Sequence, residues 1–245
     1  MDRSFNETSV KKIKSAIDNN KLVVFVGAGV SAIAGLPNWA ELIEEYATEL
    51  GLDFKSISRD QYLKIPQYYH NERGFKEYFD VLKKKFSINY KPNVIHNLIF
   101  ELNPAHIITT NYDRLIEIFD EQNGSNYFVV KKDEDLPYSS KNKMIIKMHG
   151  DIDIGNFVLR EDDYLNYSIN FRLIETFIKS LFATNLILFV GFSADDPNFN
   201  QIFNWVKEIL KKDFQSAYLL KPASLPNYLE FNYFKNRGIN ILYSI

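Results

Sequence analysis

The chain has 245 residues, with 29 basic and 31 acidic side chains and a formal net charge of −2. A chain of this length can form one large domain, or one domain with an insertion, around a core that needs no disulfide or metal. The sequence contains no cysteine, which excludes disulfides, thiolate nucleophiles and cysteine-ligated metals. The lack of a basic excess argues against direct nucleic-acid binding.

The first predicted element is an amphipathic helix, because Val10, Ile13 and Ile17 recur at helical spacing. No segment before it has the apolar core of a signal peptide, and every apolar run is far shorter than the ~18 residues of a membrane span. We therefore expect a cytoplasmic protein with no membrane partner.

Six short apolar runs predict strands. They comprise residues 22–26, 106–109, 144–147, 186–190, 217–220 and 239–243. Continuous apolar runs are typical of strands that are buried on both faces of a parallel sheet. Helix starts are predicted by the capping box Asn38–Glu41 and by the pair Asp196-Pro197. Strands that alternate with helices indicate an α/β fold, with a Rossmann-like, mostly parallel sheet and helices on both faces.

Residues 38–103 break this alternation, since they contain helical patterns and no strand candidate. We expect a single domain, 1–245, whose core comprises about residues 1–37 and 104–245. Residues 38–103 then form a helical insertion after the first strand.

A glycine-rich loop follows the first strand and opens a helix. Residues Gly27 to Ala32 read G-A-G-V-S-A, and such a loop lets the backbone approach a pyrophosphate. A dinucleotide-binding dehydrogenase would have an acidic residue at the end of a second strand about 20 positions later, but helix is predicted there. The alternative is that the glycines only permit a tight turn.

Three polar clusters follow predicted strands. They are T-T-N-Y-D at 109–113, H-G-D at 149–151 and G-F-S-A-D-D at 191–196. Ligands of open α/β sheets bind beyond the carboxyl ends of the strands, which is where these clusters are expected. The sequence has no G-x-S-x-G elbow and no P-loop, so hydrolase-triad and P-loop nucleotidase functions lose support.

Each cluster also has a simpler interpretation. Asp113 can cap the following helix, Asn111 can be a turn residue, and His149 can be a structural loop histidine. His149 with Asp151 and Asp153 can also bind a divalent metal. The other histidines, at positions 70, 96 and 106, are interpreted as structural.

Taken in order, four motifs resemble those of the sirtuin family. They are GAGVSAIAGLPNW, TTNYD, KMHGDID and VGFSADDPNF. The TTNYD form, and a tryptophan after Leu36-Pro37-Asn38, resemble the sirtuin-like domains of bacterial anti-phage defence proteins more than protein deacylases. The four-cysteine zinc module of deacylating sirtuins is missing, as is the phenylalanine-arginine pair that follows the proline there. The resemblance therefore implies an NAD+ glycohydrolase that needs no metal.

The resemblance also implies roles for individual residues. Asn111 and His149 would be catalytic and flank the nicotinamide ribose. The residues expected to bind NAD+ are Gly27, Ala28, Gly29, Ser31, Pro37, Asp113, Gly191 and Ser193. Arg160 to Tyr164 are expected to form a charged surface turn or subunit contact without a chemical role.

Two alternatives stay open at this stage. One is an NAD-dependent protein deacylase or ADP-ribosyltransferase, which would turn over NAD+ only with its peptide substrate. The other is a non-enzymatic sensor that binds NAD+ or ADP-ribose. Because free NAD+ hydrolysis would kill the host cell, the resemblance also implies control by homo-oligomerisation, a regulatory partner protein or an additional domain.

Overall fold

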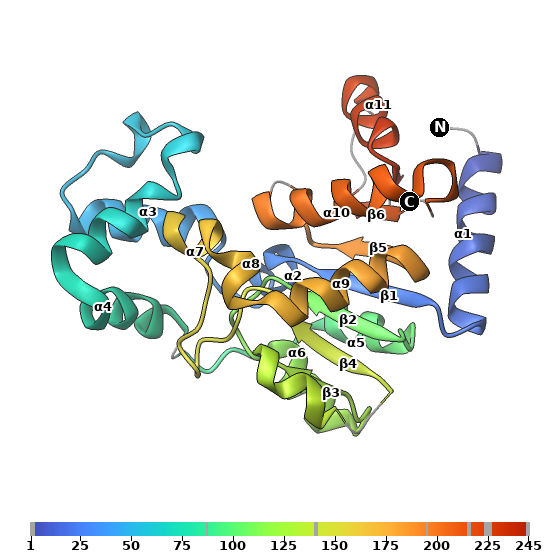
Figure 1. Ribbon diagram of the computed structural model, residues 1–245, viewed down its shortest axis with the longest axis horizontal. Coiled ribbons are helices and arrows are strands. Elements are labelled where there is room, and N and C mark those ends of the chain that lie inside the picture. Colours follow the sequence, from blue (N-terminus) through green and yellow to red (C-terminus); the bar gives the residue numbers. More distant parts are fainter. Residues whose placement is uncertain are drawn as a thin grey trace.

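The strands form one seven-stranded sheet, in which every pair of neighbours is parallel and the order is β3-β4-β2-β1-β5-β6-β7 (Figure 1). The computed structural model describes residues 3–86, 88–139, 142–194, 196–214, 217–222 and 227–243. The strands are β1 (Leu22–Val26), β2 (His106–Thr109), β3 (Phe128–Val130), β4 (Met144–Lys147), β5 (Leu186–Val190), β6 (Ala217–Lys221) and β7 (Ile239–Tyr243). The six predicted strands and the parallel sheet are confirmed.

Helices cover both faces of the sheet, as the α/β pattern predicts. One face packs against α1 (Arg3–Asp18), α2 (Ala28–Ala32), α5 (Val94–Glu101) and α6 (Leu115–Asn123). The other packs against α8 (Tyr167–Asn170), α9 (Arg172–Thr184), α10 (Pro197–Leu210) and α11 (Tyr228–Asn236). Along β1, Val24 contributes to the first core, whereas Val23 and Phe25 contribute to the second. The alternation explains why the whole strand is apolar.

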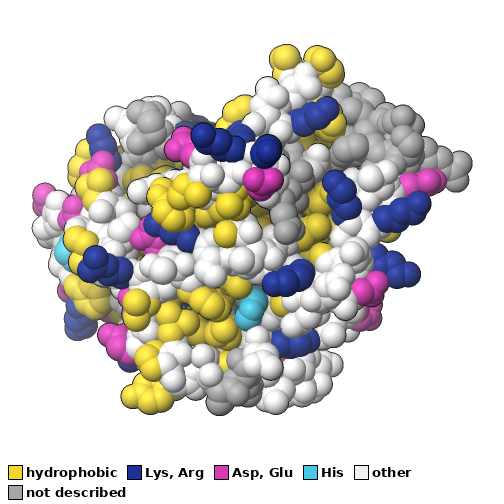
Figure 2. All heavy atoms as spheres, turned by 45° about the vertical axis from the view of Figure 1, so that its right-hand side comes forward, with side chains coloured by type: hydrophobic (Ala, Val, Ile, Leu, Met, Phe, Trp, Pro, Cys, Tyr) yellow, Lys and Arg dark blue, Asp and Glu magenta, His cyan; other side chains and the backbone are white. Residues whose placement is uncertain are grey.

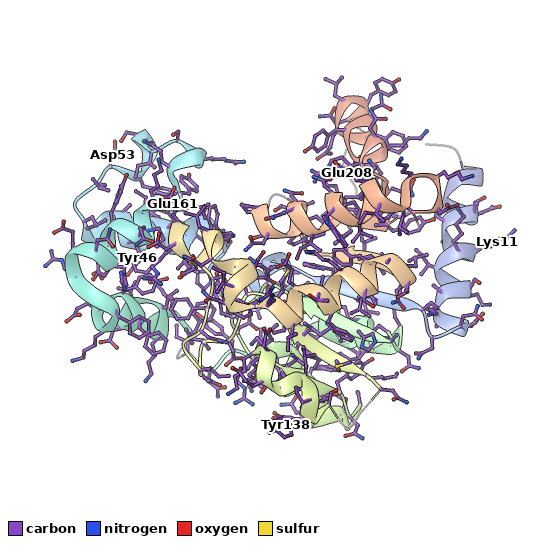
Figure 3. All side chains as sticks on the ribbon, in the orientation of Figure 1. Lys11, Tyr46, Asp53, Tyr138, Glu161 and Glu208 are labelled. Carbon is purple, nitrogen blue, oxygen red and sulfur yellow. The ribbon has the colours of Figure 1, made fainter. Side chains whose placement is uncertain are left out.

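A separate helical part lies beyond the carboxyl ends of the strands, on the left of Figure 1. It contains α3 (Trp39–Glu49), η1 (Phe54–Ser56), η2 (Arg59–Gln61) and α4 (Lys64–Phe86), with α7 (Glu161–Leu165) beside them. Tyr46 lies between α3 and α4 (Figure 3), where its ring stacks on Tyr78 at 5.3 Å and its hydroxyl donates to the Tyr78 carbonyl at 2.8 Å. Tyr112 and Phe157, from loops that follow β2 and β4, complete this third core. The helical part is therefore anchored to the loops at the end of the sheet.

The division into a core and an insertion at residues 38–103 stays a prediction. Helix α5 lies inside the predicted insertion but packs against the sheet. Ile99 of α5 belongs to the core against the sheet rather than to the core of α3 and α4. Capping boxes at Asn38 and Asn93 mark the starts of α3 and α5. Because α5 packs on the sheet, the helices that pack away from it are α3 and α4.

Three short elements complete the described chain, namely β3, η3 and η4. Strand β3 was not predicted, because it has three residues and lies at the sheet edge, where two of them are half-buried. A strand this short shows no periodicity in the sequence. The remaining elements are η3 (Asp133–Tyr138) and η4 (Lys211–Asp213).

The surface of the described residues carries both positively and negatively charged side chains (Figure 2). None of their helices is both long and apolar enough to cross a membrane. On the face drawn in Figure 2, lysine, arginine and acidic side chains are interspersed with apolar ones. This mixture agrees with the balanced charge of the sequence.

Replacing His106 by glutamine is expected to weaken the acid sensitivity of the fold. Burial, with a contribution from Lys143, lowers the pKa of His106 to about 4 from its ordinary 6.5. The unfolded chain therefore takes up this proton before the folded chain does, and the stability that neutral His106 confers is lost as the pH falls from about 6.5 toward 4.

Urea unfolding at pH 7 and pH 4.5 measures this effect. The wild type should lose about 1–2 kcal/mol more between the two values than His106→Gln, less than the full shift implies because the side chain keeps some contact with water. Equal losses in the two proteins would contradict the prediction.

Candidate active site

A cavity of about 430 Å³ opens where the carboxyl ends of the central strands face the helical part. The loops after β1, β2, β4 and β5 form its floor. Leu36, Trp39 and Leu42 line it from the start of the helical part, and Phe86 lines it from the end of α4. The cavity is thus polar on the side of the sheet and apolar on the side of the helices, as ligand sites commonly are.

The sequence-predicted residues converge on this cavity. Nine of the ten line it, namely Asn111, His149, Ala28, Gly29, Ser31, Pro37, Asp113, Gly191 and Ser193. Gly27 does not line it, but its carbonyl oxygen accepts a hydrogen bond from Asn111 Nδ2 at 3.3 Å. Asp195, from the third polar cluster, lies outside the described residues. The structure thus brings residues from four loops together, while their individual roles remain predictions.

The glycines of the β1–α2 loop have a clear packing reason. The N–H of Gly29 donates to the Gly191 carbonyl at 2.9 Å. A Cβ atom on Gly27 would lie 2.7 Å from Phe192 Cα, and one on Gly29 would lie 2.9 Å from the Gly191 oxygen. The loop after β1 therefore packs backbone against backbone on the loop after β5, which the tight-turn interpretation only partly anticipated.

Gly191→Ala is expected to destabilise the protein by more than Gly124→Ala. Both glycines have a left-handed backbone, with φ of +63° and +65°. A Cβ atom at Gly191 would lie 2.7 Å from Val30 N, whereas one at Gly124 meets nothing within 4 Å. We expect a cost of about 1 kcal/mol at Gly124 and about 2–3 kcal/mol at Gly191. Thermal unfolding measures the stability loss of both variants. Equal losses would contradict the prediction, because they would show that the contact with Val30 does not destabilise Gly191→Ala.

Asn111 is held in the cavity wall by contacts that fix its amide. Its Nδ2 donates to the Ser31 hydroxyl at 3.0 Å and to the Gly27 carbonyl at 3.3 Å. Because that carbonyl can only accept, the amide nitrogen must face it. Its backbone N–H donates to the Thr109 hydroxyl at 3.0 Å. The Oδ1 atom is left buried without a hydrogen-bond partner among the described residues, so it is free for a ligand.

His149 is buried in the same cavity wall, with 2% of its surface exposed. The Tyr164 and Tyr167 rings meet the imidazole edge-on, with ring centroids 5.5 and 6.0 Å away. The backbone carbonyl of His149 accepts a hydrogen bond from the Val158 N–H at 3.0 Å. Nε2 lies 3.5 Å from Asp196 Oδ2 and makes no hydrogen bond to the described residues. The ring is therefore held by packing, and its Nε2 faces the Asp196 carboxylate.

Lys147 connects the loops that carry Asn111 and His149, although it is completely buried. Its ammonium donates to the backbone carbonyls of Tyr112 and Asp113 at 3.1 and 2.6 Å and to Asp151 Oδ2 at 2.7 Å. Glu117 Oε1 lies 2.9 Å from the same ammonium. Burial favours a neutral amine, but the surrounding carboxylates raise the pKa of Lys147 above its ordinary value. Lys147 is therefore charged and fixes both loops.

The carboxylates that the sequence offers as metal ligands, Asp151 and Asp153, are engaged in other contacts. Asp151 pairs with Lys147 and with Lys131 at 3.0 Å, and Asp153 lies 3.7 Å from Arg114. Burial would raise the pKa of Asp151, but the two lysines hold it below its ordinary value. Within the described residues, no group of three or more histidine, aspartate or glutamate side chains is arranged to hold a metal ion. Asp151 instead ties its loop to Lys147 and Lys131.

Sequence reasoning gave no site role to several residues that line the cavity, Tyr164, Asp196 and Phe86 among them. Tyr164 was assigned to a surface turn without a chemical role, but it lines the cavity and donates a hydrogen bond to Asp196 at 3.3 Å. Asp196 belongs to the third polar cluster and was predicted to cap α10, but it was given no role of its own in the site. Phe86 gave no signal, because it is one apolar residue at the end of a long helix that the fold brings to the sheet edge.

The comparisons with known proteins agree with the four motifs. The SIR2-like domain family matches residues 105–242. The chain is 38% identical over 95% of its length to "Defense-associated sirtuin 2" of Bacillus subtilis and 31% identical over 86% to "NAD(+) hydrolase ThsA" of Enterococcus faecium. It is 28% identical over 44% of its length to an "NAD-dependent protein deacetylase" of Staphylococcus epidermidis.

The chain spans 24% of the Bacillus relative and 45% of the Enterococcus relative. The match to the deacetylase covers 113 residues and 44% of that protein. The family assignment depends on the domain that covers more than half of this chain and includes both His149 and Asn111. The chain belongs to the SIR2-like domain family.

Proposed function

We propose that this protein is an NAD+ glycohydrolase, which cleaves the bond between nicotinamide and ribose to give nicotinamide and ADP-ribose. The observation that carries the proposal is the convergence of two buried side chains, Asn111 and His149, in one cavity, with Asn111 Oδ1 lacking a hydrogen bond within the described chain. The relatives named as NAD+ hydrolases support the same reaction.

The chemistry of the reaction fits these residues. Nicotinamide leaves as a neutral molecule, so its departure needs no acid, and the ribose passes through an oxocarbenium-like state. The protein must then position a water molecule and the ribose hydroxyls and keep the pocket closed. Asn111 Oδ1 can accept a hydrogen bond from the water or from a ribose hydroxyl. His149 can take up the proton of that group as a general base.

The other predicted site residues would contact the pyrophosphate and the adenosine half of NAD+. The Ala28 backbone at the start of α2 and the Ser31 hydroxyl would contact the pyrophosphate, while the Gly29 N–H stays bonded to the Gly191 carbonyl. Gly191 and Ser193 would border the adenosine half, and Asp113, whose Oδ1 accepts the Leu115 N–H at 2.9 Å, fixes the start of α6 beside the site. Pro37 and the helical part would cover the bound substrate.

We further propose that the protein depletes NAD+ in anti-phage defence and acts in the cytoplasm. An enzyme that consumed NAD+ freely would harm its own cell, so its activity requires control by homo-oligomerisation or by a regulatory partner. The name of the Bacillus relative supports the role in defence.

The test is to incubate the concentrated protein with NAD+ alone and to separate the products by chromatography. Release of nicotinamide without any peptide is the expected result. Release only after addition of an acyl-lysine peptide would instead identify a deacylase. NAD+ binding without release under either condition would favour the sensor, and failure to bind NAD+ would overturn the proposal.

A further inference from the structure

Asp196 has a carboxylate whose contacts exceed those of a helix cap. Its Oδ1 accepts the Phe199 N–H at 2.8 Å, which caps the first turn of α10. Its Oδ2 takes no part in that cap. It accepts the Tyr164 hydroxyl at 3.3 Å and lies 3.5 Å from His149 Nε2. The second oxygen is therefore directed to the cavity wall, where the side chain is 12% exposed.

The Asp196 carboxylate faces the His149 imidazole. Among the described residues, no lysine or arginine forms an ion pair with this carboxylate, and His149 is the one titratable cation within 4 Å. Burial would raise the pKa of Asp196, but the charge of His149 and the hydrogen bonds from Phe199 and Tyr164 hold it below its ordinary value. The carboxylate is therefore ionised at neutral pH and faces an imidazole.

We propose that Asp196 is the positioning residue for His149, and that Tyr164 holds the carboxylate in place. The carboxylate favours the tautomer in which Nε2 carries the hydrogen and points toward Oδ2, so that Nδ1 is the base. It also stabilises the imidazolium that forms once His149 has accepted a proton. This inference rests on the proposed function.

The proton and electron balance of the step is complete. The oxygen of water forms a bond to the ribose C1′, and the electron pair of the C1′–N bond leaves with nicotinamide. The proton of the water goes to His149 Nδ1. Asp196 exchanges no proton and stays a carboxylate throughout.

The N-cap offers a way to separate the two roles of Asp196. Serine, asparagine and aspartate cap helices about equally well. Asp196→Ser therefore keeps a cap for α10 but removes the oxygen that reaches His149, and Asp196→Asn keeps the shape but removes the charge. Asn227, whose side chain caps α11 away from the cavity, provides the matched control Asn227→Ser.

The first readout is the steady-state kinetics of nicotinamide release. We expect Asp196→Ser and Asp196→Asn to lower kcat by roughly 100-fold, with KM changed by less than about threefold, because general-base catalysis contributes about 10²–10⁴-fold. Asn227→Ser should keep the wild-type kcat. A wild-type kcat in Asp196→Ser would show that Asp196 is only a cap and would overturn the inference.

Tyr164→Phe tests the order of the contacts. It removes the hydroxyl but keeps the ring against His149, so we expect a smaller loss of kcat than in Asp196→Ser. If Tyr164 acts through Asp196, adding Tyr164→Phe to Asp196→Ser produces no further loss. Fully additive losses would contradict the proposed arrangement.

The second readout does not depend on activity. The imidazole ¹⁵N resonances of His149, identified as those lost in His149→Ala, report which nitrogen carries the hydrogen. We expect the Nε2–H tautomer in the wild type and a mixture in Asp196→Ser. An unchanged tautomer would overturn the inference. If no nicotinamide is released by the wild type under any condition, the proposed function fails, and the tautomer still decides whether Asp196 positions His149.

Discussion

Asn111→Ala is expected to lower the kcat of nicotinamide release by about 100- to 1,000-fold, the loss typical of removing one preorganised group that stabilises a transition state. The reason is local. The Asn111 side chain is 6% exposed, and its Nδ2 is committed to Gly27 and Ser31, so its Oδ1 can point in only one way. Alanine removes that acceptor, and the space it leaves admits a disordered water.

The matched control is Asn97→Ala on α5, where the asparagine is exposed and donates to Glu101 at 2.6 Å. This variant should keep the wild-type kcat. Product chromatography at saturating NAD+ measures all three proteins. If Asn111→Ala turned over NAD+ at the wild-type rate, Asn111 would be a turn residue, as its position after a strand also allows.

Lys147→Met is expected to lower the free energy of unfolding by about 3–5 kcal/mol, the cost of breaking a buried charge network from one side. Methionine matches the length of lysine but cannot donate to the carbonyls of Tyr112 and Asp113. It also leaves Glu117 buried without its cation and Asp151 with Lys131 alone. The stability loss should be accompanied by lost activity, because both catalytic loops lose their common anchor.

Urea unfolding followed by circular dichroism measures this cost. Lys14→Met, on the exposed surface of α1, is the control and should change the stability by less than about 0.5 kcal/mol. Should Lys147→Met prove as stable as the control, the network would have no net role in holding the loops. Burial raises the pKa of Glu117 even beside Lys147, whereas the two lysines hold the pKa of Asp151 below its ordinary value.

Local sequence patterns predicted much of the fold. The apolar runs identified six strands because a parallel sheet buries both faces of each strand, as β1 and β5 do here. Asn38 and Asp196 marked helix starts because their side chains bond to nearby backbone N–H groups. These signals are contained within a few residues, so they can be read without knowledge of the tertiary structure.

The features that the sequence did not predict depend on contacts between distant segments. Lys147 ended a predicted strand and was given no role, because its partner Glu117 is 30 positions away. Tyr164 reaches Asp196 across 32 positions. Such pairs become visible only when the order of the strands is known, because that order places the loops after β4, β2, β1 and β5 in succession along one edge of the sheet.

The most direct test of the central claim is to measure NAD+ binding and nicotinamide release in parallel for the wild type and His149→Ala. His70→Ala, on α4 away from the cavity, is the control. The proposed mechanism predicts that His149→Ala binds NAD+ within a few-fold of the wild type but releases nicotinamide at least about 100-fold more slowly. Release at the wild-type rate by His149→Ala would contradict the assignment of the base and, with it, the proposed site.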